Sequence, residues 1–246
     1  MTAPTTAHAT ASFGMWMMLP SPELAAAASA EGYDYVALDR QHGYIAQHDV
    51  PVLARAIRSA GDAQVTVRCT KVDFAELGAL ADAGVDTVIV PLISSAADAA
   101  ECVRALNYPP VGERSWGPTA DLVTGSPDPT DSTRRPQLLV MIENKAGLDA
   151  LEEICTVPGI DGIYIGPSDL AFALGHTPGV PHVEIETTIE DIRTRVEHHG
   201  LVAAIHCGSG AEAQTRAAQG FTVVTSAIDV LAARGAFAHE LTTARH

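Results

Sequence analysis

The chain has 246 residues, of which 47% are hydrophobic but only 5% aromatic, and its net charge is −15. This length suits one α/β barrel or one doubly wound domain. The abundance of small aliphatic residues suits a parallel sheet covered by alanine-rich helices. A surface this acidic repels phosphate backbones and anionic lipids, so the composition argues against nucleic-acid binding and membrane binding.

The cysteines and the first residues indicate a cytoplasmic protein. Cys69, Cys102, Cys155 and Cys207 show no paired spacing, which favours free thiols over disulfides or a zinc site. Residues 1–12 lack the basic start and apolar run of a signal peptide, and we expect them to form a flexible tail. No apolar run approaches the length of a membrane span.

Eight short apolar runs alternate with helical patterns along the chain. This alternation predicts a (β/α)8 TIM barrel, an α/β fold, as a single domain over residues 1–246. The predicted strands are Gly14–Met18, Tyr35–Leu38, Val65–Arg68, Thr87–Val90, Leu138–Ile142, Gly162–Ile165, Val202–His206 and Thr222–Ser226. The predicted helices, which carry apolar residues three and four apart, are Pro22–Ala30, Asp49–Ala60, Phe74–Ala83, Ala96–Leu106, Ala146–Ile154, Ile185–His199, Ala211–Gln219 and Asp229–Thr243.

One stretch interrupts this alternation. Residues Tyr108–Gln137 are rich in proline and show no sustained apolar period. Loops of this length usually form lids or binding walls, and part of this one could instead run beneath the barrel. Tyr108 and Trp116 offer packing anchors, which argues against a disordered spacer.

Ionisable side chains occur where four of the predicted strands end. Asp39 and His42 follow the second strand, Arg68 ends the third, Glu143 follows the fifth and Asp169 follows the sixth. In a barrel of parallel strands, these ends share the rim on which active sites are built. The sequence therefore predicts a site there with a base, a cation and two carboxylates.

Glu143 and Asp169 are the candidate metal ligands. Neighbouring parallel strands lie about 4.8 Å apart, so carboxylates on adjacent strand ends can share one cation. Ligation by oxygen alone favours Mg²⁺ or Mn²⁺ over zinc. The alternative is that either residue merely caps a helix.

The turn Gly166-Pro167-Ser168-Asp169 is a candidate anion site. Glycine allows a ligand to approach closely, and the amides of Ser168 and Asp169 point outward from a helix N-terminus, where they can bind a carboxylate or phosphate. His42 beside Asp39 could act as a general base, although it could also be an ordinary rim histidine. Arg68 could stabilise an enolate oxygen or form a structural salt bridge to a rim carboxylate.

Taken together, several motifs are similar to those of a known enzyme family. They are Leu38-Asp39-x-Gln41-His42-Gly43, Val67-Arg68, Val90-Pro91, Tyr108-Pro109-Pro110-x-Gly112-x-Arg114, Ile142-Glu143 and the run from Asp161 to Leu170. In this series the chain resembles the class II, metal-dependent hydroxy-keto-acid aldolases, the 4-hydroxy-2-oxoheptanedioate aldolase family of the citrate-lyase-like superfamily. The similarity extends from about Gly14 to Ala233.

The resemblance implies a (β/α)8 barrel, often assembled as a hexamer, which is a trimer of dimers that exchange the last helix. It implies a divalent metal (Mg²⁺, Mn²⁺ or Co²⁺) held by Glu143 and Asp169, and pyruvate chelates this metal. The resemblance assigns Arg68 to stabilise the enolate, His42 as the base, and Asp39 to the aldehyde end of the site. Asp82 matches an aspartate linked to the catalytic histidine, but it lies at a helix C-terminus and would have to act across a subunit contact.

Three positions depart from the family pattern. Family members often carry Asp-Gly-Glu-His where this chain has Asp39-Arg40-Gln41-His42. Gln41 cannot supply the negative charge of a glutamate, although it can still hydrogen-bond to substrate, and Arg40 adds a cation near the entrance. Met141 replaces a glutamine that is common two positions before the metal-binding glutamate, which removes a polar contact.

The sequence thus predicts a carbon–carbon lyase that reversibly cleaves a 4-hydroxy-2-keto acid to pyruvate, or a close 2-keto acid, and an aldehyde. Substrate contacts are expected from Arg68, Gly166, Pro167, Ser168 and Gln41. Three alternatives stay open: a Schiff-base aldolase using Lys145, a lyase for acyl-coenzyme A or citramalyl-type substrates, and a catalytically silent metabolite-binding paralogue.

Overall fold

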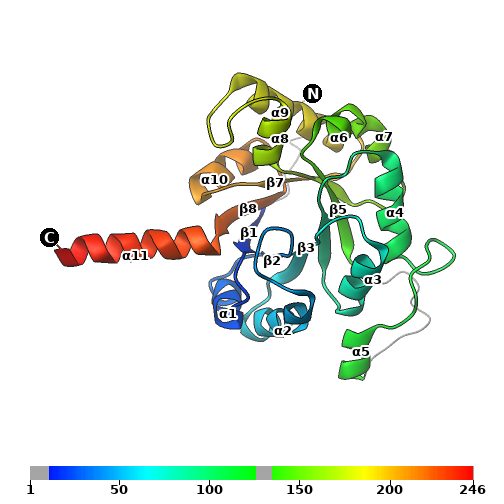
Figure 1. Cartoon of the computed structure of the whole chain (residues 1–246), viewed down its shortest axis with the longest axis horizontal. Helices are drawn as coiled ribbons and strands as arrows, with labels where there is room; N and C mark the ends of the chain where they lie inside the picture. Colours follow the sequence, from blue (N-terminus) through cyan, green and yellow to red (C-terminus); the bar gives the residue numbers. More distant parts are fainter. Residues whose placement is uncertain (1–10, 126–134, 246) are drawn as a thin grey trace, which may run out of the picture.

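Eight parallel strands close into a single barrel in the computed structural model, which describes residues 11–125 and 135–245. The strands pair in chain order, and the last closes on the first (Figure 1). This confirms the (β/α)8 prediction. The strands are β1 (Ser12–Met17), β2 (Tyr35–Asp39), β3 (Gln64–Arg68), β4 (Thr87–Val90), β5 (Gln137–Ile142), β6 (Gly162–Ile165), β7 (Val202–His206) and β8 (Val223–Ile228).

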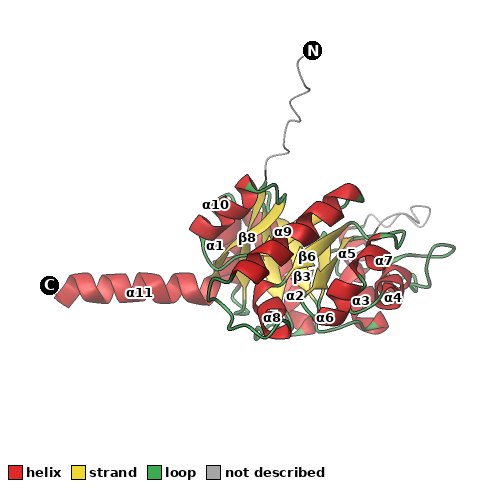
Figure 2. Cartoon of the chain, turned by 90° about the horizontal axis from the view of Figure 1, so that it is seen from above, coloured by secondary structure: helices red, strands yellow, loops and turns green. Residues whose placement is uncertain are grey.

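Helices connect successive strands and cover the outside of the barrel (Figure 2). Side chains at their starts fix several boundaries, since Ser21, Asp73 and Ser95 each accept a hydrogen bond from a first-turn amide. The helices are α1 (Pro22–Ala30), the 3-10 turn η1 (Gln47–Asp49), α2 (Val50–Ala60), α3 (Phe74–Asp82), α4 (Ala96–Leu106), α5 (Thr119–Thr124), α6 (Lys145–Asp149), α7 (Leu151–Cys155), α8 (Pro167–Ala173), α9 (Val183–His198), α10 (Gly210–Ala218) and α11 (Asp229–Arg245).

The structure corrects several predicted boundaries. The predicted helix Ala146–Ile154 is two short helices, α6 and α7, which meet at Ala150. The short helix α5 was not predicted, because it is too short to show an apolar period. For α8, the sequence predicted only the helix start after Gly166, and the structure shows a helix over Pro167–Ala173. Strand β1 begins at Ser12, so the expected tail ends before that residue, and its residues 1–10 lie outside the described part of the chain.

The irregular stretch after α4 lies at the N-terminal end of the barrel. Tyr108, Arg114 and Trp116 line a cavity there together with Gln64 and Gln137, the first residues of β3 and β5. The described part of the stretch therefore runs beneath the barrel and does not cover the rim formed by the strand C-termini. Residues 126–134 of the predicted loop lie outside the described structure.

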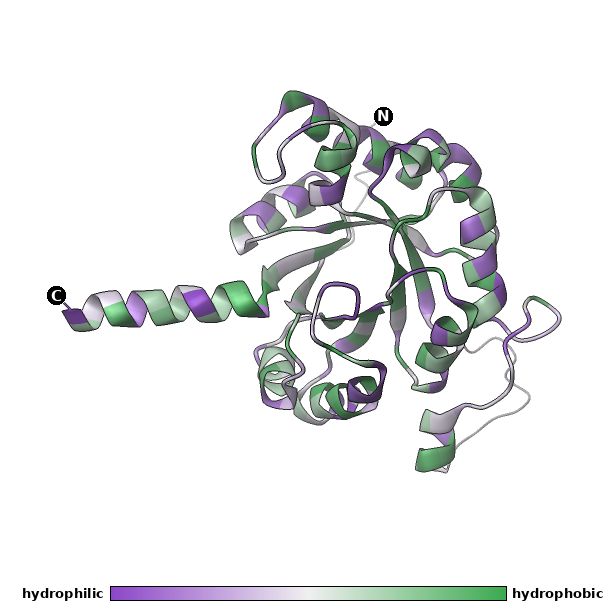
Figure 3. Cartoon of the chain, in the orientation of Figure 1, coloured by the Kyte–Doolittle hydropathy of each residue, from purple (hydrophilic) through white to green (hydrophobic). Residues whose placement is uncertain are grey.

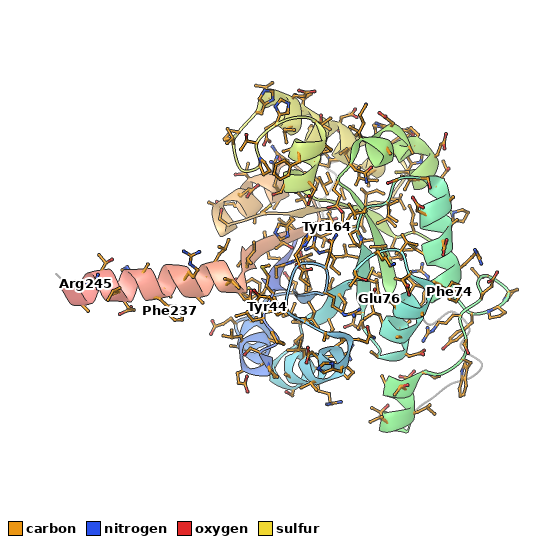
Figure 4. All side chains as sticks on the ribbon, viewed as in Figure 1. Tyr44, Phe74, Glu76, Tyr164, Phe237 and Arg245 are labelled. Carbon is orange, nitrogen blue, oxygen red and sulfur yellow. The ribbon has the colours of Figure 1, made fainter. Side chains whose placement is uncertain are left out.

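Two apolar layers hold the fold together. The larger layer lies between strands and helices and contains aliphatic side chains such as Val36, Leu53 and Leu77. The smaller fills the barrel interior and includes Trp16 and Tyr164, of which Figure 4 labels Tyr164. The described part of the chain contains no helix long and apolar enough to cross a membrane. The four cysteines are free and buried.

Helix α11 is the exception to this packing. It contacts the barrel near its start, at β1 and β8, and then projects away from it (Figure 1). Leu231, Phe237 and Leu241 are more than half exposed on it, and apolar residues recur along its length (Figure 3). In a single chain, the end of this helix has no core to pack on.

The barrel interior predicts the effect of one substitution. A Cβ atom added at Gly14 would lie 2.0 Å from the ring of Tyr35, which is buried inside the barrel. Overpacking of this kind costs about 1–3 kcal/mol, so Gly14→Ala should lower the free energy of unfolding, measured by denaturant titration, by at least that amount. Gly78→Ala in α3 meets no atom within 4 Å and should be neutral or stabilising. Equal stability of the two variants would contradict this packing.

Candidate functional site

A cavity of about 220 Å³ opens at the C-terminal ends of the strands. It brings together eight of the residues predicted from the sequence: Asp39, His42, Arg68, Glu143, Gly166, Pro167, Ser168 and Asp169. Trp16, Met18, Met141, His206 and Ile228 complete the lining. Residues in β1, β2, β3, β5, β7 and β8, together with the turn that follows β6, therefore converge at one point.

Strand register places Asp39 directly opposite Arg68. The two residues are Cα partners at the ends of β2 and β3. Arg68 donates from Nε to Asp39 Oδ1 at 2.9 Å and from an Nη atom to Asp39 Oδ2 at 2.6 Å, a bidentate pair. The guanidinium also lies 4.9 Å from the Trp16 ring centre, and the Trp16 indole N–H donates to Asp39.

Asp39 also shapes the loop that carries His42. Its Oδ1 accepts the backbone N–H groups of Gln41 at 3.0 Å and His42 at 3.2 Å. Burial would raise the pKa of Asp39, but the hydrogen bonds and charge of Arg68 outweigh burial, so the pKa lies below its usual value. In this geometry Asp39 positions Arg68 and the His42 loop.

Glu143 and Asp169 form the second charged group of the cavity. Burial, together with repulsion from Asp169, raises the pKa of Glu143. Oε1 of Glu143 accepts the backbone N–H of Leu92 at 2.8 Å, whereas Oε2 is buried without a hydrogen-bond partner. A divalent cation would satisfy that oxygen and offset the repulsion, so the donor set fits a metal that prefers oxygen ligands.

Two backbone features hold the Glu143 carboxylate in place. Leu92 has a φ of 59°, a left-handed conformation that is uncommon for leucine, and this turns its N–H toward Glu143. A Cβ atom at Gly166 would lie 2.6 Å from Glu143 Oε2. Glycine at this position therefore leaves room for the free carboxylate oxygen.

Pro167 and Ser168 form the start of α8, and Asp169 lies in its first turn. Pro167 occupies the first helical turn, where its missing N–H costs nothing. The N-terminal end of α8 is thus directed at the cavity that holds Glu143. The amides of its first turn can stabilise the carboxylate of a bound keto acid.

His206 is a site residue that the sequence reasoning missed. It ends β7, lines the cavity, and packs edge-on against Trp16 with ring centres 4.7 Å apart. Burial, reinforced by the positive charge of Arg68, lowers the pKa of His206 to about 4, so the ring is neutral at physiological pH. Its position at a strand end was the available signal, as it was for Arg68.

Three residues named from the sequence lie elsewhere. Asp82 ends α3 at the N-terminal side of the barrel, where Arg114 donates to it at 2.6 Å, so it does not reach His42 within one chain. Gln41 does not line the cavity, and its side-chain Oε1 is buried without a partner. Arg40 pairs with Glu76 of α3 and is therefore not a free cation at the entrance.

The match to a family model extends over most of the chain. Residues 12–236 match the model described as HpcH/HpaI aldolase/citrate lyase. The chain belongs to this family. This confirms the resemblance found in the sequence motifs.

Individual relatives agree with the family assignment. The chain is 37% identical over 218 residues to a hydroxypyruvate/pyruvate aldolase of Rhizorhabdus wittichii, covering 87% of this chain and 86% of that protein. It is 31% identical over 223 residues to a 5-keto-4-deoxy-D-glucarate aldolase of Klebsiella pneumoniae, covering 88% and 86%. The crystal structure of an HpcH/HpaI aldolase/citrate lyase family protein from Burkholderia cenocepacia superposes with a TM-score of 0.89 at 28% identity, covering 95% and 94% of the two chains.

In this HpcH/HpaI family member, Asp39→Asn should destabilise the fold as well as the site. The substitution leaves the buried Arg68 cation without its counter-charge, which typically costs about 3–5 kcal/mol. Since the folded-state pKa of Asp39 is lowered, its stabilising contribution is present above the ordinary aspartate pKa and is lost as pH falls through the lowered value.

We therefore expect a lower melting temperature for Asp39→Asn at pH 7 and a smaller loss of stability on acidification than in the wild type. Asp49→Asn is the matched control, because Asp49 is part-exposed at η1, where it contacts His48 and accepts the backbone N–H of Ala46. Equal melting temperatures for Asp39→Asn and the wild type at pH 7 would contradict a stabilising pair.

Proposed function

We propose that this chain is a class II, pyruvate-dependent aldolase of the cytoplasm that reversibly cleaves a 4-hydroxy-2-keto acid to pyruvate, or a close 2-keto acid, and an aldehyde. One observation carries the proposal. A single cavity is lined by an arginine, a histidine and two acidic groups, of which Glu143 keeps a buried oxygen without a partner. The family, whose members include proteins named as pyruvate aldolases, supports the same chemistry.

Glu143 and Asp169 would hold the divalent metal, which is Mg²⁺, Mn²⁺ or Co²⁺. When bound, the metal supplies Lewis-acid polarisation of the keto oxygen. The N-terminal amides of α8, with Ser168 and Pro167 beside Gly166, would bind the substrate carboxylate. These contacts would fix the keto acid with its carbonyl toward Arg68.

Arg68 would stabilise the negative charge that develops on the keto oxygen as the C3–C4 bond breaks. Asp39 accepts hydrogen bonds from Nε and one Nη on one edge of its guanidinium, and the orientation is therefore set before substrate binds. His42 would take the proton from the 4-hydroxyl, directly or through water, and return a proton to the pyruvate methyl carbon after the aldehyde leaves. The neutral His206, which lines the same cavity, would offer a hydrogen bond to the substrate.

Two alternatives fit the geometry less well. A Schiff-base aldolase requires a lysine in the cavity, but the Lys145 side chain is 69% exposed and pairs with Asp149. A lyase for acyl-coenzyme A would need a basic, extended surface for the nucleotide, whereas this chain carries a net charge of −15. The third alternative, a metabolite-binding paralogue without catalytic activity, is distinguished by the experiment below.

Exchange of the pyruvate methyl protons with D₂O tests the proposal without knowledge of the aldehyde. Proton NMR measures this exchange. We expect the exchange to stop when a chelator removes the metal and to return when Mg²⁺, Mn²⁺ or Co²⁺ is added. Glu143→Gln should reduce it by at least about a hundredfold, since the metal would lose one ligand and its charge stabilisation. His42→Ala should cost about a hundredfold to ten-thousandfold, the range for a positioned general base.

Lys145→Ala is the matched control, and its exchange rate should equal that of the wild type. Exchange that persists after rigorous removal of metal, together with borohydride trapping of pyruvate on the protein, would replace the proposal with the Schiff-base mechanism. Metal and pyruvate binding without exchange would identify a silent paralogue.

We further propose a homo-oligomer, with a hexamer built as a trimer of dimers as the expected form. Two features support it. Helix α11 projects from its own barrel with Phe237 72% exposed (Figure 4), and Asp82 can approach a His42 side chain only in another subunit. Packing α11 against a second barrel would remove its apolar residues from water.

Sedimentation tests this assembly. The wild type should sediment as an oligomer at micromolar concentration, and Phe237→Glu should shift it toward a smaller species, because a charge would be buried at the contact. Glu240→Gln, on the same exposed helix, is the control and should leave the distribution unchanged. A wild-type monomer with full exchange activity would refute both the assembly and the role of Asp82.

A further inference from the structure

Two histidines and a glutamate meet where α8 leads into α9, outside the cavity that holds Glu143 and Asp169. His176 lies in the connection, His182 caps α9, and Glu184 lies in its first turn. One nitrogen or oxygen from each of the three side chains lies within 4.8 Å of the other two. Figure 1 shows this connection curving beside α8 and α9.

Specific contacts hold the three groups together. His176 Nε2 lies 2.7 Å from Glu184 Oε2, and the rings of His176 and His182 stack with centres 3.7 Å apart. The Nδ1 atom of His182 accepts the backbone N–H of Glu184 at 3.2 Å. The imidazoles are therefore already gathered around one carboxylate, with a candidate ligand atom of each group within 4.8 Å of the others.

We propose that His176, His182 and Glu184 form a second metal site, which selects Zn²⁺ or a similar late transition-metal ion. Imidazole nitrogens suit zinc, copper and nickel, whereas Mg²⁺ prefers oxygen ligands. Zinc–nitrogen and zinc–oxygen bonds are about 2.0–2.2 Å long, so ligand atoms around one ion lie roughly 3–3.6 Å apart. The ion would take the place of the proton between His176 and Glu184, and water would complete a tetrahedral set.

The two metal sites would therefore differ in chemistry. The site at Glu143 and Asp169 offers oxygen alone and suits Mg²⁺ or Mn²⁺, whereas the second site offers two nitrogens and one oxygen. Zn²⁺ bound at the second site should not be displaced by millimolar Mg²⁺. This selectivity separates occupancy of the second site from metal activation of the aldolase site.

The location gives the second site a structural consequence. His182 lines a cavity of about 530 Å³ that shares Ser168 and His206 with the aldolase cavity. An ion on His176 and Glu184 would tie the end of α8 to the start of α9, across a connection that contains Gly175 and Gly179 in left-handed conformations. Binding of Zn²⁺ would thus fix one wall of the space next to Ser168.

Zinc binding to untagged protein tests the site without any measurement of activity. The starting protein carries Glu143→Gln and Asp169→Asn, which removes the first site. After equilibrium dialysis against Zn²⁺ in millimolar Mg²⁺, elemental analysis should find one tightly held Zn²⁺ ion per chain, and Zn²⁺ should raise the melting temperature. Adding His176→Ala and His182→Ala should weaken that affinity by at least about tenfold, because loss of even an outer contact to a metal ligand can cost that much.

The matched control replaces a second histidine pair. His198 and His199 are also neighbours, and His199 contacts Glu152 at 2.8 Å, but these groups form no cluster of three ligands in the described structure. His198→Ala with His199→Ala should retain the Zn²⁺ affinity and the rise in melting temperature. Failure of the starting protein to hold Zn²⁺, or equal affinity in both histidine double variants, would overturn the site. The outcome is independent of the proposed aldolase activity, which pyruvate proton exchange tests.

Discussion

The ion pair between Asp39 and Arg68 is the constraint on which the barrel mouth depends. Both side chains are buried, with exposed fractions of 1% and 9%. Moving such charges out of water costs several kcal/mol each, so neither could occupy its position without the other. The pairing follows directly from strand register, because the two residues are Cα partners at the ends of β2 and β3. Register errors at these strands would therefore carry a large penalty.

A buried pair of this kind is weak evidence for stability alone, since apolar residues of similar volume often replace such pairs without loss. In this structure, the pair fixes the positions of the groups around it. Asp39 uses both carboxylate oxygens on Arg68, and Oδ1 also receives the amides of the His42 loop. One carboxylate thus orients both the candidate base and the candidate cation. Among the described residues, Glu143 Oε2 has no hydrogen-bond partner, so this carboxylate is not held by an ion pair as Asp39 is.

The sequence predicted the fold and the strand-end residues well, for a physical reason. Parallel strands buried on both faces read as continuous apolar runs, and a charge that ends such a run must lie at the rim. Pairing between side chains depends on register, which the runs do not reveal. The sequence therefore left Arg68 with two roles, whereas the structure shows one guanidinium in a salt bridge that also lines the cavity. The sequence likewise did not reveal the partner of Arg40, which was predicted to be a cation near the entrance but forms an ion pair with Glu76.

Other parts of the site were beyond sequence reasoning because they depend on backbone conformation or on burial. The left-handed φ of Leu92 directs its amide at Glu143. Glycine is the usual residue in this conformation, so a leucine in the sequence does not indicate it. In the sequence, nothing distinguished His206 from the other nine of the ten histidines as a residue of the site. Its burial, with the nearby charge of Arg68, lowers its pKa to about 4, and its ring packs against Trp16. Short helices such as α5 have too few turns to show a helical period of apolar residues in the sequence.

The same mouth is connected to the projecting helix by hydrogen bonds. Asp229, the first residue of α11, accepts the amides of Met18 and Leu19 just after β1, each at 3.0 Å. The carbonyl of Met18 accepts the amide of Tyr44, two residues beyond His42. The start of α11 and the His42 loop are therefore held by the same turn of chain. Within the described chain, no residue of α11 beyond Asp229 is buried in its own barrel. If α11 packs against a second subunit, as proposed above, that contact would act on the turn that also holds the His42 loop.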